Sequence, residues 1–422
     1  MFGQVTYSIS SIIVEEFNIS SCEAIPVPPT DVDVIARGVN AKVHGHLDVK
    51  HWLIKDSVTF NLALWDISSS GTLATFKDPS GRPAVILSAC QSEVVKAKLH
   101  LSGGASWFYN LFTFLLEKPI RDNLNRKLCP RINEVIKILQ KELSTFQVTA
   151  DLGGNGQMDY SLISRPHVQK TYIDLDIKGT IQHFGIEEEQ DSNLDPIRLP
   201  DLQSSMVLVG MSEYFFNNIG KSYFMSDILK FTITQQQYPH VFWLKTGDYG
   251  SIIPEMSDFY PASQAMILRL KATKPPVINL TSQLSMEMEG LLQASVVLPY
   301  LITKEAYSAN VKATFYADSL HLVNLKMIVS FALQSFQISE FKSEVGPVNV
   351  ALLTESLGQS LKESLLLTIN NALRGGIPMP TLANVTVEES EVRIIPGCLW
   401  ASLEMYYIPW KELLNVLPYH RT

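Results

Sequence analysis

The chain has 422 residues, of which 46% are hydrophobic and 18% charged, and its formal net charge is −8 at pH 7. This composition excludes general disorder, and the length exceeds what one hydrophobic core usually organises, so two domains are expected. No basic stripe interleaved with aromatic residues occurs, which argues against a nucleic-acid partner.

The first third of the sequence alternates between apolar and polar residues with a period of two. Val39, Ala41 and Val43 alternate with Asn40 and Lys42, and similar runs recur up to residue 101. This period is typical of strands with one dry face. The pattern therefore predicts an antiparallel meander over residues 32–101, ending at the Ser102-Gly103-Gly104 break.

Residues 107–146 change to apolar steps of three and four, which predicts a long amphipathic helix. Pro119 and Pro130 each remove an amide donor and crowd the preceding turn, so bends or breaks are expected near both. An apolar helix face of this kind packs on a core in most proteins, but it can also line a cavity for a ligand.

The second half repeats this plan after a polar segment, 187–203, that contains Pro196 and Pro200 and is interpreted as a linker. Strands are predicted near 205–209, 228–232, 241–244, 265–270, 311–317 and 325–333. A helix is predicted over 350–373, with Gly375-Gly376 as its stop. We therefore expect domains at 1–186 and 204–422, and an α+β fold in which each long helix lies against a curled antiparallel sheet.

Enzyme signatures such as GxSxG, HExxH and GxGxxG are absent from the sequence, so we expect no catalytic residues. Gly220-Lys221-Ser222 resembles the end of a phosphate-binding loop, but Phe215 stands where its first glycine is required. His44 and His46 share a strand face without an evident third ligand, so neither a metal nor a cofactor is expected.

No apolar run reaches the roughly 18 residues of a membrane span, and the nearest one, 291–302, contains Gln293 and Pro299. Residues 1–10 lack the features of a signal peptide. Three N-glycosylation triplets, at Asn18, Asn279 and Asn384, weakly favour secretion.

Four cysteines are too few for a disulfide scaffold. Pairing of Cys90 with Cys129 would tie the strand region to the middle of the long helix, whereas four free buried thiols would fit a cytosolic protein. The states of Cys22 and Cys398 are left open.

Several sequence stretches carry a resemblance to a known family. The longest is Glu117-Lys118-Pro119-Ile120-Arg121-Asp122-Asn123-Leu124-Asn125-Arg126-Lys127-Leu128-Cys129-Pro130, and others are Ser80-Gly81-Arg82-Pro83, Met158-Asp159-Tyr160-Ser161-Leu162-Ile163, Glu213-Tyr214-Phe215-Phe216-Asn217, Ala272-Thr273-Lys274-Pro275-Pro276 and Gly376-Ile377-Pro378-Met379-Pro380. Together they resemble the lipid-binding serum glycoprotein family, and the similarity covers nearly the whole chain.

The resemblance implies an elongated, boomerang-shaped and secreted molecule whose two barrel-plus-helix domains are joined by a central sheet. It also implies a Cys90–Cys129 disulfide and an apolar pocket in each domain for the acyl chains of a phospholipid. Such proteins begin with a signal peptide and a further helix, so we expect the first domain here to lack its first helix.

The resulting hypothesis is a monomeric carrier that binds phospholipid or a similar amphiphile. Its candidate lipid-binding residues are Phe108, Leu111, Phe112, Leu115 and Leu116 in the first domain and Val350, Leu353, Leu357, Leu361 and Leu365 in the second. One alternative is a host-defence protein that binds lipopolysaccharide or membrane surfaces, although the hairpin tips at 40–56 and 101–106 lack clustered cations. Another alternative is a structural or interaction module without a lipid.

Overall fold

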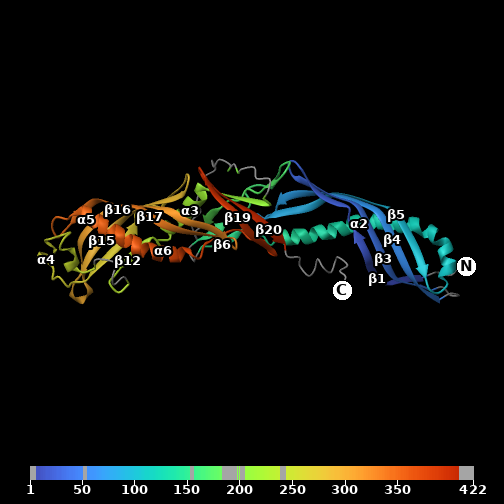
Figure 1. Cartoon of the computed structure of the whole chain (residues 1–422), viewed down its shortest axis with the longest axis horizontal. Coiled ribbons are helices and arrows are strands. Elements are labelled where there is room, and N and C mark those ends of the chain that lie inside the picture. Colours follow the sequence, from blue (N-terminus) through green and yellow to red (C-terminus); the bar gives the residue numbers. More distant parts are fainter. Residues whose placement is uncertain are drawn as a thin grey trace.

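A computed structural model describes residues 6–50, 55–152, 156–182, 197, 199, 205–237 and 244–407. The molecule is elongated, with the first long helix and its sheet at one end and a second sheet with its helices at the other (Figure 1). Smaller sheets lie between these ends. The predicted α+β fold with two similar halves is confirmed. The predicted linker, 187–203, lies almost entirely outside the described residues.

The first sheet is an antiparallel meander, as its alternating sequence predicts. It contains β1 (Thr6–Asn18), β2 (Ser21–Val27), β3 (Asp31–Lys50), β4 (Lys55–Lys77) and β5 (Pro83–Ser102). The order is β1-β3-β4-β5, with β2 also paired to β3. The β4–β5 turn is fixed by Asp78, whose Oδ1 accepts the amides of Ser80 and Arg82 at 2.8 and 2.9 Å.

The first long helix follows as α1 (Ser106–Tyr109), a 3-10 turn η1 (Asn110–Phe112) and α2 (Thr113–Leu143). Pro119 and Pro130 lie inside α2, so the helix does not break at either residue, and a bend there stays a prediction. Packing of Ile120, Leu124 and Leu128 on the sheet holds the surrounding turns helical. The irregular turn lies earlier, where Asn110 exchanges two hydrogen bonds with the Leu101 backbone at 2.9 and 2.7 Å.

The centre of the molecule combines segments from both halves. One sheet has the order β10-β7-β6, from β6 (Thr149–Asp151), β7 (Gln157–Asp159) and β10 (Thr180–Gln182). A second has the order β11-β20-β19, from β11 (Val207–Ser212), β19 (Val385–Ile395) and β20 (Cys398–Tyr407). A two-stranded ribbon pairs β8 (His167–Val168) with β9 (Ile173–Asp174). The C-terminal strands therefore lie in the middle of the molecule.

The second large sheet runs β12-β13-β15-β16-β17-β18, with β14 on β15. Its strands are β12 (Lys230–Ile233), β13 (Met266–Ala272), β14 (Val277–Leu280), β15 (Leu284–Val297), β16 (Thr303–Val323), β17 (Lys326–Ser343) and β18 (Ile377–Pro378). The predicted helix forms as α5 (Val350–Ser360) and α6 (Leu366–Leu373), joined by the π-helical turn η4 (Leu361–Leu365). Short turns η2 (Thr246–Tyr249), α4 (Met256–Phe259) and η3 (Pro299–Leu301) complete this half.

One helix, α3 (Glu213–Met225), was not anticipated from the sequence. Its aromatic residues and Gly220 have poor helix propensity. The Ser212 hydroxyl caps the helix by accepting the Phe215 amide at 3.2 Å, and Phe215, Phe216 and Ile219 are buried. Capping and tertiary burial therefore outweigh the propensity.

Candidate functional site

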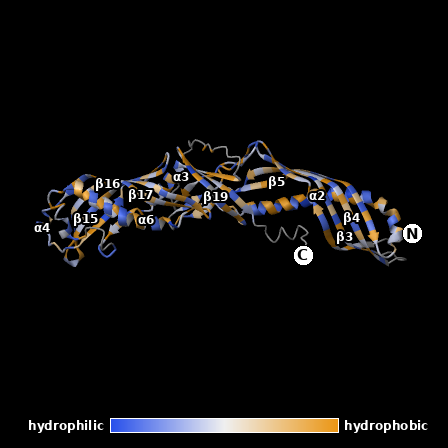
Figure 2. Cartoon of the chain, viewed as in Figure 1, coloured by the Kyte–Doolittle hydropathy of each residue, from blue (hydrophilic) through white to orange (hydrophobic). Residues whose placement is uncertain are grey.

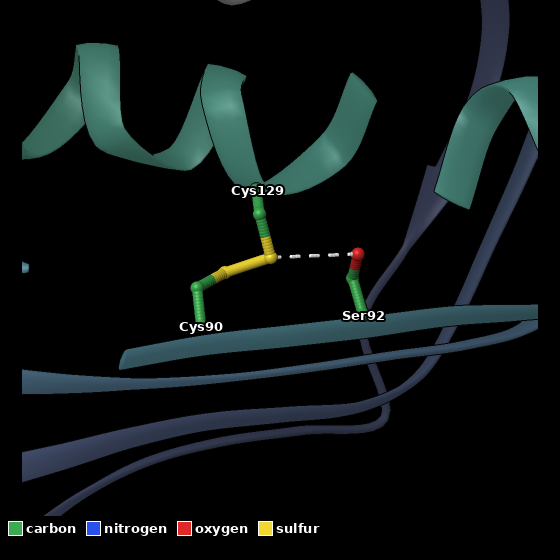
Figure 3. Close-up of a disulfide and its surroundings, with 3 residues drawn as sticks. All are labelled: Cys90, Ser92 and Cys129. Carbon is green, nitrogen blue, oxygen red and sulfur yellow. Dashed lines mark hydrogen bonds between the residues drawn. A yellow bond between two sulfur atoms is a disulfide. The ribbon is translucent and has the colours of Figure 1, made fainter. Parts of the chain in front are cut away.

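A disulfide between Cys90 on β5 and Cys129 on α2 pins the first helix to its sheet (Figure 3). The two Cα atoms are 5.8 Å apart, and the Ser92 hydroxyl lies 3.7 Å from Cys129 Sγ. Cys22 is free and exposed, whereas Cys398 is free and buried, and burial raises the pKa of its thiol. The disulfide fixes the middle of α2 and leaves both of its ends to other contacts.

The contact between α2 and the first sheet is narrow. Leu124 and Leu128 pack on one small cluster of sheet residues, and Ile120 packs on another together with Tyr109 of α1. Among the side chains of α2 only Thr113 and Glu142 are buried. A helix of 31 residues that buries no apolar side chain completely leaves much of its apolar face without a protein partner.

The exposed apolar surface is concentrated at the start of this helix. Seven large apolar side chains there are between 46% and 74% exposed, among them all five first-domain candidates: Trp107, Phe108, Leu111, Phe112, Phe114, Leu115 and Leu116. We call this set the helix-start patch. Strand β1 exposes a second apolar row of Ile9, Ile12, Ile13 and Phe17. Figure 2 shows hydrophobic residues recurring along α2 and the adjacent strands. Clustered exposed apolar side chains are typical of binding sites for a lipid, a membrane or another protein.

The second-domain candidates have a different environment. Leu353, Leu357 and Leu361 are 1%, 8% and 7% exposed and belong to the largest hydrophobic cluster, which extends over the second sheet and the centre. Val350 is half-buried, and the side chain of Leu365 lies outside the described residues. These leucines thus lie between helix and sheet, as predicted, but they are packed against protein atoms.

The centre of the molecule contains a cavity of about 450 Å³ that sequence reasoning did not anticipate. Arg82 lines it and donates from Nε to the Phe146 carbonyl oxygen at 3.0 Å. The other lining residues are 145–151 and Pro378. Because Thr145, Gln147, Thr149 and Asp151 make much of this lining polar, the cavity is less suited to acyl chains than the helix-start patch.

Motifs that carry the family resemblance hold this centre together. Asp159 accepts the Ser161 amide at 2.8 Å and pairs with Lys178 Nζ at 3.1 Å. Burial raises the pKa of Asp159, but these hydrogen bonds and the Lys178 charge outweigh burial, so its pKa lies below the ordinary value. The Tyr160 hydroxyl donates to the Pro378 carbonyl, and burial raises the pKa of this phenol. These residues therefore have structural roles.

The described part of the chain contains no group of three or more His, Cys, Asp or Glu side chains placed to hold a metal ion. His44 and His46 lie with ring centroids 6.2 Å apart, and His44 Nδ1 is 2.7 Å from Asn61 Oδ1. Among the described helices none combines the length and apolarity needed to cross a bilayer.

The three predicted glycosylation sites differ in accessibility. Asn18 is exposed at the end of β1, and Asn279 is half-buried within β14. Asn384 is half-buried, and its Nδ2 donates to Glu142 Oε2 at 3.0 Å. Glycosylation of all three stays a prediction, with Asn18 the most accessible site.

The fold consists of two antiparallel sheets, each with a long helix, which are joined end to end through central strands. The chain belongs to the LBP / BPI / CETP family, whose N-terminal domain matches residues 1–142 and whose C-terminal domain matches residues 154–407. This family consists of lipid-binding proteins.

Individual relatives extend along nearly the whole chain. The BPI fold-containing family C protein of Mus musculus is 27% identical and covers 97% of this chain and 84% of its own length. The lipopolysaccharide-binding protein of Mus musculus is 25% identical over 96% of this chain and 85% of its own length. A crystal structure of lipopolysaccharide binding protein has a TM-score of 0.66 and 25% identity, covering 96% of this chain and 89% of that chain.

Proposed function

We propose that this protein is a secreted, monomeric lipid carrier that holds the acyl chains of a phospholipid or a similar amphiphile against the helix-start patch. The observation that carries this proposal is the exposure of Phe108, Leu111, Phe112, Leu115 and Leu116, together with the row on β1. An acyl chain bound to these side chains would remove its own apolar surface and that of the protein from water. The Cys90–Cys129 disulfide supports an extracellular location, because disulfides persist in oxidising compartments.

The energy available from such burial is large. Each buried methylene contributes about 0.8 kcal/mol, so one chain of about sixteen carbons supplies on the order of 10 kcal/mol before ordering costs. Affinity would therefore depend on acyl-chain length more than on the headgroup, which would remain near solvent.

We propose that the second domain can also bind an acyl chain, but only after its helix has separated from the sheet. A chain entering there must displace Leu353, Leu357 and Leu361 from the core, which costs stability. The π-helical turn η4 between α5 and α6 is the point in this helix where such a change could begin, since π turns interrupt the regular ladder. We therefore expect the first domain to load first.

Native mass spectrometry and lipid extraction of the purified, secreted protein test the proposal. The expected result is one tightly held phospholipid-sized molecule per chain, and two molecules would show that the second domain opens as well. If the purified protein contains no lipid and takes up no phosphatidylcholine from vesicles, the carrier function is eliminated. That result would favour a structural or protein-interaction module.

Lipopolysaccharide is the second candidate ligand, favoured by the lipopolysaccharide-binding relatives. Its phosphates require clustered cations. Here Lys42 pairs with Glu16 at 2.8 Å and Lys96 pairs with Asp66 at 3.4 Å, so both lysines already have carboxylate partners. Binding that weakens steeply between low and high salt would support this candidate, whereas salt-independent binding supports acyl-chain capture.

A further inference from the structure

The hairpin that joins β15 to β16 has an unusual turn. Val297 pairs with Thr303, and the Leu298 amide donates to the Ile302 carbonyl oxygen at 2.7 Å. The residues at the turn, Tyr300 and Leu301, have φ angles of +63° and +62°. Two successive positive φ angles in a tight hairpin favour Asn-Gly, because a Cβ disfavours this backbone region. Tyrosine and leucine are therefore costly residues for this turn.

These costly residues bury nothing within the chain. Tyr300, Leu301 and Ile302 are 96%, 85% and 60% exposed. The turn at the other end of β16 provides an internal comparison, since Asn324 and Leu325 also have positive φ angles. There the first position is an asparagine, and Leu325 packs against the main core. The fold thus explains Leu325 but gives no reason for Tyr300 and Leu301.

The surroundings of the tip favour a lipid surface as its partner. Residues 290–303 contain no charged side chain, and Lys304 and Glu305, which follow, are exposed charges of opposite sign. The tip exposes three consecutive apolar residues, a surface far smaller than the one that a stable protein interface buries. A bilayer can enclose a protrusion of any size, with the tyrosine hydroxyl at the headgroups and the aliphatic side chains below.

We propose that the tip Tyr300-Leu301-Ile302 inserts into the interfacial layer of a phospholipid bilayer and docks the protein there. This surface belongs to the second sheet, whereas the helix-start patch belongs to the first helix, at the other end of the molecule (Figure 1). The proposal is therefore independent of lipid loading: protein that carries no lipid should still dock.

The test uses the full chain with sucrose-loaded vesicles of phosphatidylcholine, assayed by co-sedimentation. The variant Tyr300→Asn/Leu301→Gly places the preferred residues in the turn, so the hairpin should form at least as well as in the wild type. We expect its partition coefficient to fall about tenfold or more, because the inserted apolar area is lost. Binding of the wild type should persist in about 0.5 M NaCl, roughly three times physiological ionic strength, since no ion pair is involved.

Val323→Thr is the matched control, because it removes exposed apolar surface at the opposite end of β16 and should bind as the wild type does. Hydrogen–deuterium exchange locates the contact: vesicles should slow exchange in residues 298–302. Unchanged binding by the Tyr300→Asn/Leu301→Gly variant, or unchanged exchange at the tip, overturns the proposal. Absence of co-sedimentation of the wild type with vesicles also overturns the proposal and favours a protein partner for the tip.

Discussion

Asn384 donates its side-chain amide to Glu142 Oε2 at 3.0 Å, which ties the last turn of α2 to the segment that precedes β19. Glu142 is a buried residue, 5% exposed, so the Asn384 amide is an important partner for its carboxylate. The neighbouring bond from the Ala383 amide to Thr145 Oγ1, at 3.0 Å, strengthens the same junction. The first helix therefore depends on residues near the end of the chain.

The substitution Asn384→Asp should place a second carboxylate against Glu142 and lower the free energy of unfolding by about 1–3 kcal/mol. The double variant Glu142→Gln/Asn384→Asp should recover most of this loss, because the new amide can donate to the new carboxylate. Chemical denaturation measures the free energy of unfolding of the single and the double variant. Thr386→Ala removes the same glycosylation triplet without touching this bond, so it controls for a lost glycan. Equal stability of Asn384→Asp and Thr386→Ala would contradict the role given to the bond.

Loss of the Cys90–Cys129 disulfide should loosen the first domain. The bond closes a loop with a sequence separation of 39, and in the chain-entropy model such a loop contributes about 4 kcal/mol. Cys90→Ser/Cys129→Ser should lower the melting temperature and speed proteolysis within α2. Cys22→Ser, at the exposed free thiol, should change neither quantity. Equal protease sensitivity of the two variants would show that packing alone holds the helix.

Asp159 should make stability depend on pH at the acid end. Its pKa is lowered in the folded protein, so its stabilising contribution is present above the ordinary pKa of about 3.9 and is lost as the pH falls through the lowered folded value. Asp159→Asn should cost about 1–2 kcal/mol at pH 7, and the difference from the wild type should shrink below about pH 4. Asp258→Asn, at an exposed carboxylate, serves as the control. A stability difference that is constant with pH would refute this ionic contribution.

Leu111→Ser/Leu115→Ser should separate lipid binding from folding. Both side chains are more than half exposed, so the free energy of unfolding should change by no more than about 0.5 kcal/mol. Retention of phosphatidylcholine, measured by lipid extraction, should fall strongly because the acyl chain loses its apolar contacts. Ile86→Ser, at an exposed apolar residue on β5 outside the helix-start patch, should retain lipid normally. Full retention by the double variant would show that the helix-start patch is not the site.

Much of the fold was predictable because its long elements have clear hydrophobic periods. Alternation around Val39–Val43 predicted strands, and three- and four-residue steps predicted both long helices. The sequence allowed a break at Pro119 or Pro130, but none occurs, because sheet contacts hold the surrounding turns of α2 helical. Helix α3 was missed because its cap at Ser212 and the burial of Phe215 overcome a weak local preference.

The candidate site was predictable only in part. The sequence marks Phe108 and Leu353 alike as apolar helix residues, yet the structure exposes the first and buries the second. Leu353 packs against sheet and central residues that are distant in sequence, whereas Phe108 remains 47% exposed, so the sequence pattern alone does not separate the two. The tip at Tyr300 could not be predicted either, because residues 291–302 form an ordinary apolar run in the sequence and only the turn geometry shows which of them are exposed.

The bond between Glu142 and Asn384 spans 242 residues, and this separation has a consequence during synthesis. A ribosome adds about 5–20 residues per second, so the end of α2 must wait on the order of tens of seconds for its partner to emerge. During that interval the nascent first half carries its exposed apolar helix without the anchor at its far end. Chaperones that shield such surfaces on growing chains would therefore act on this half before the second half exists.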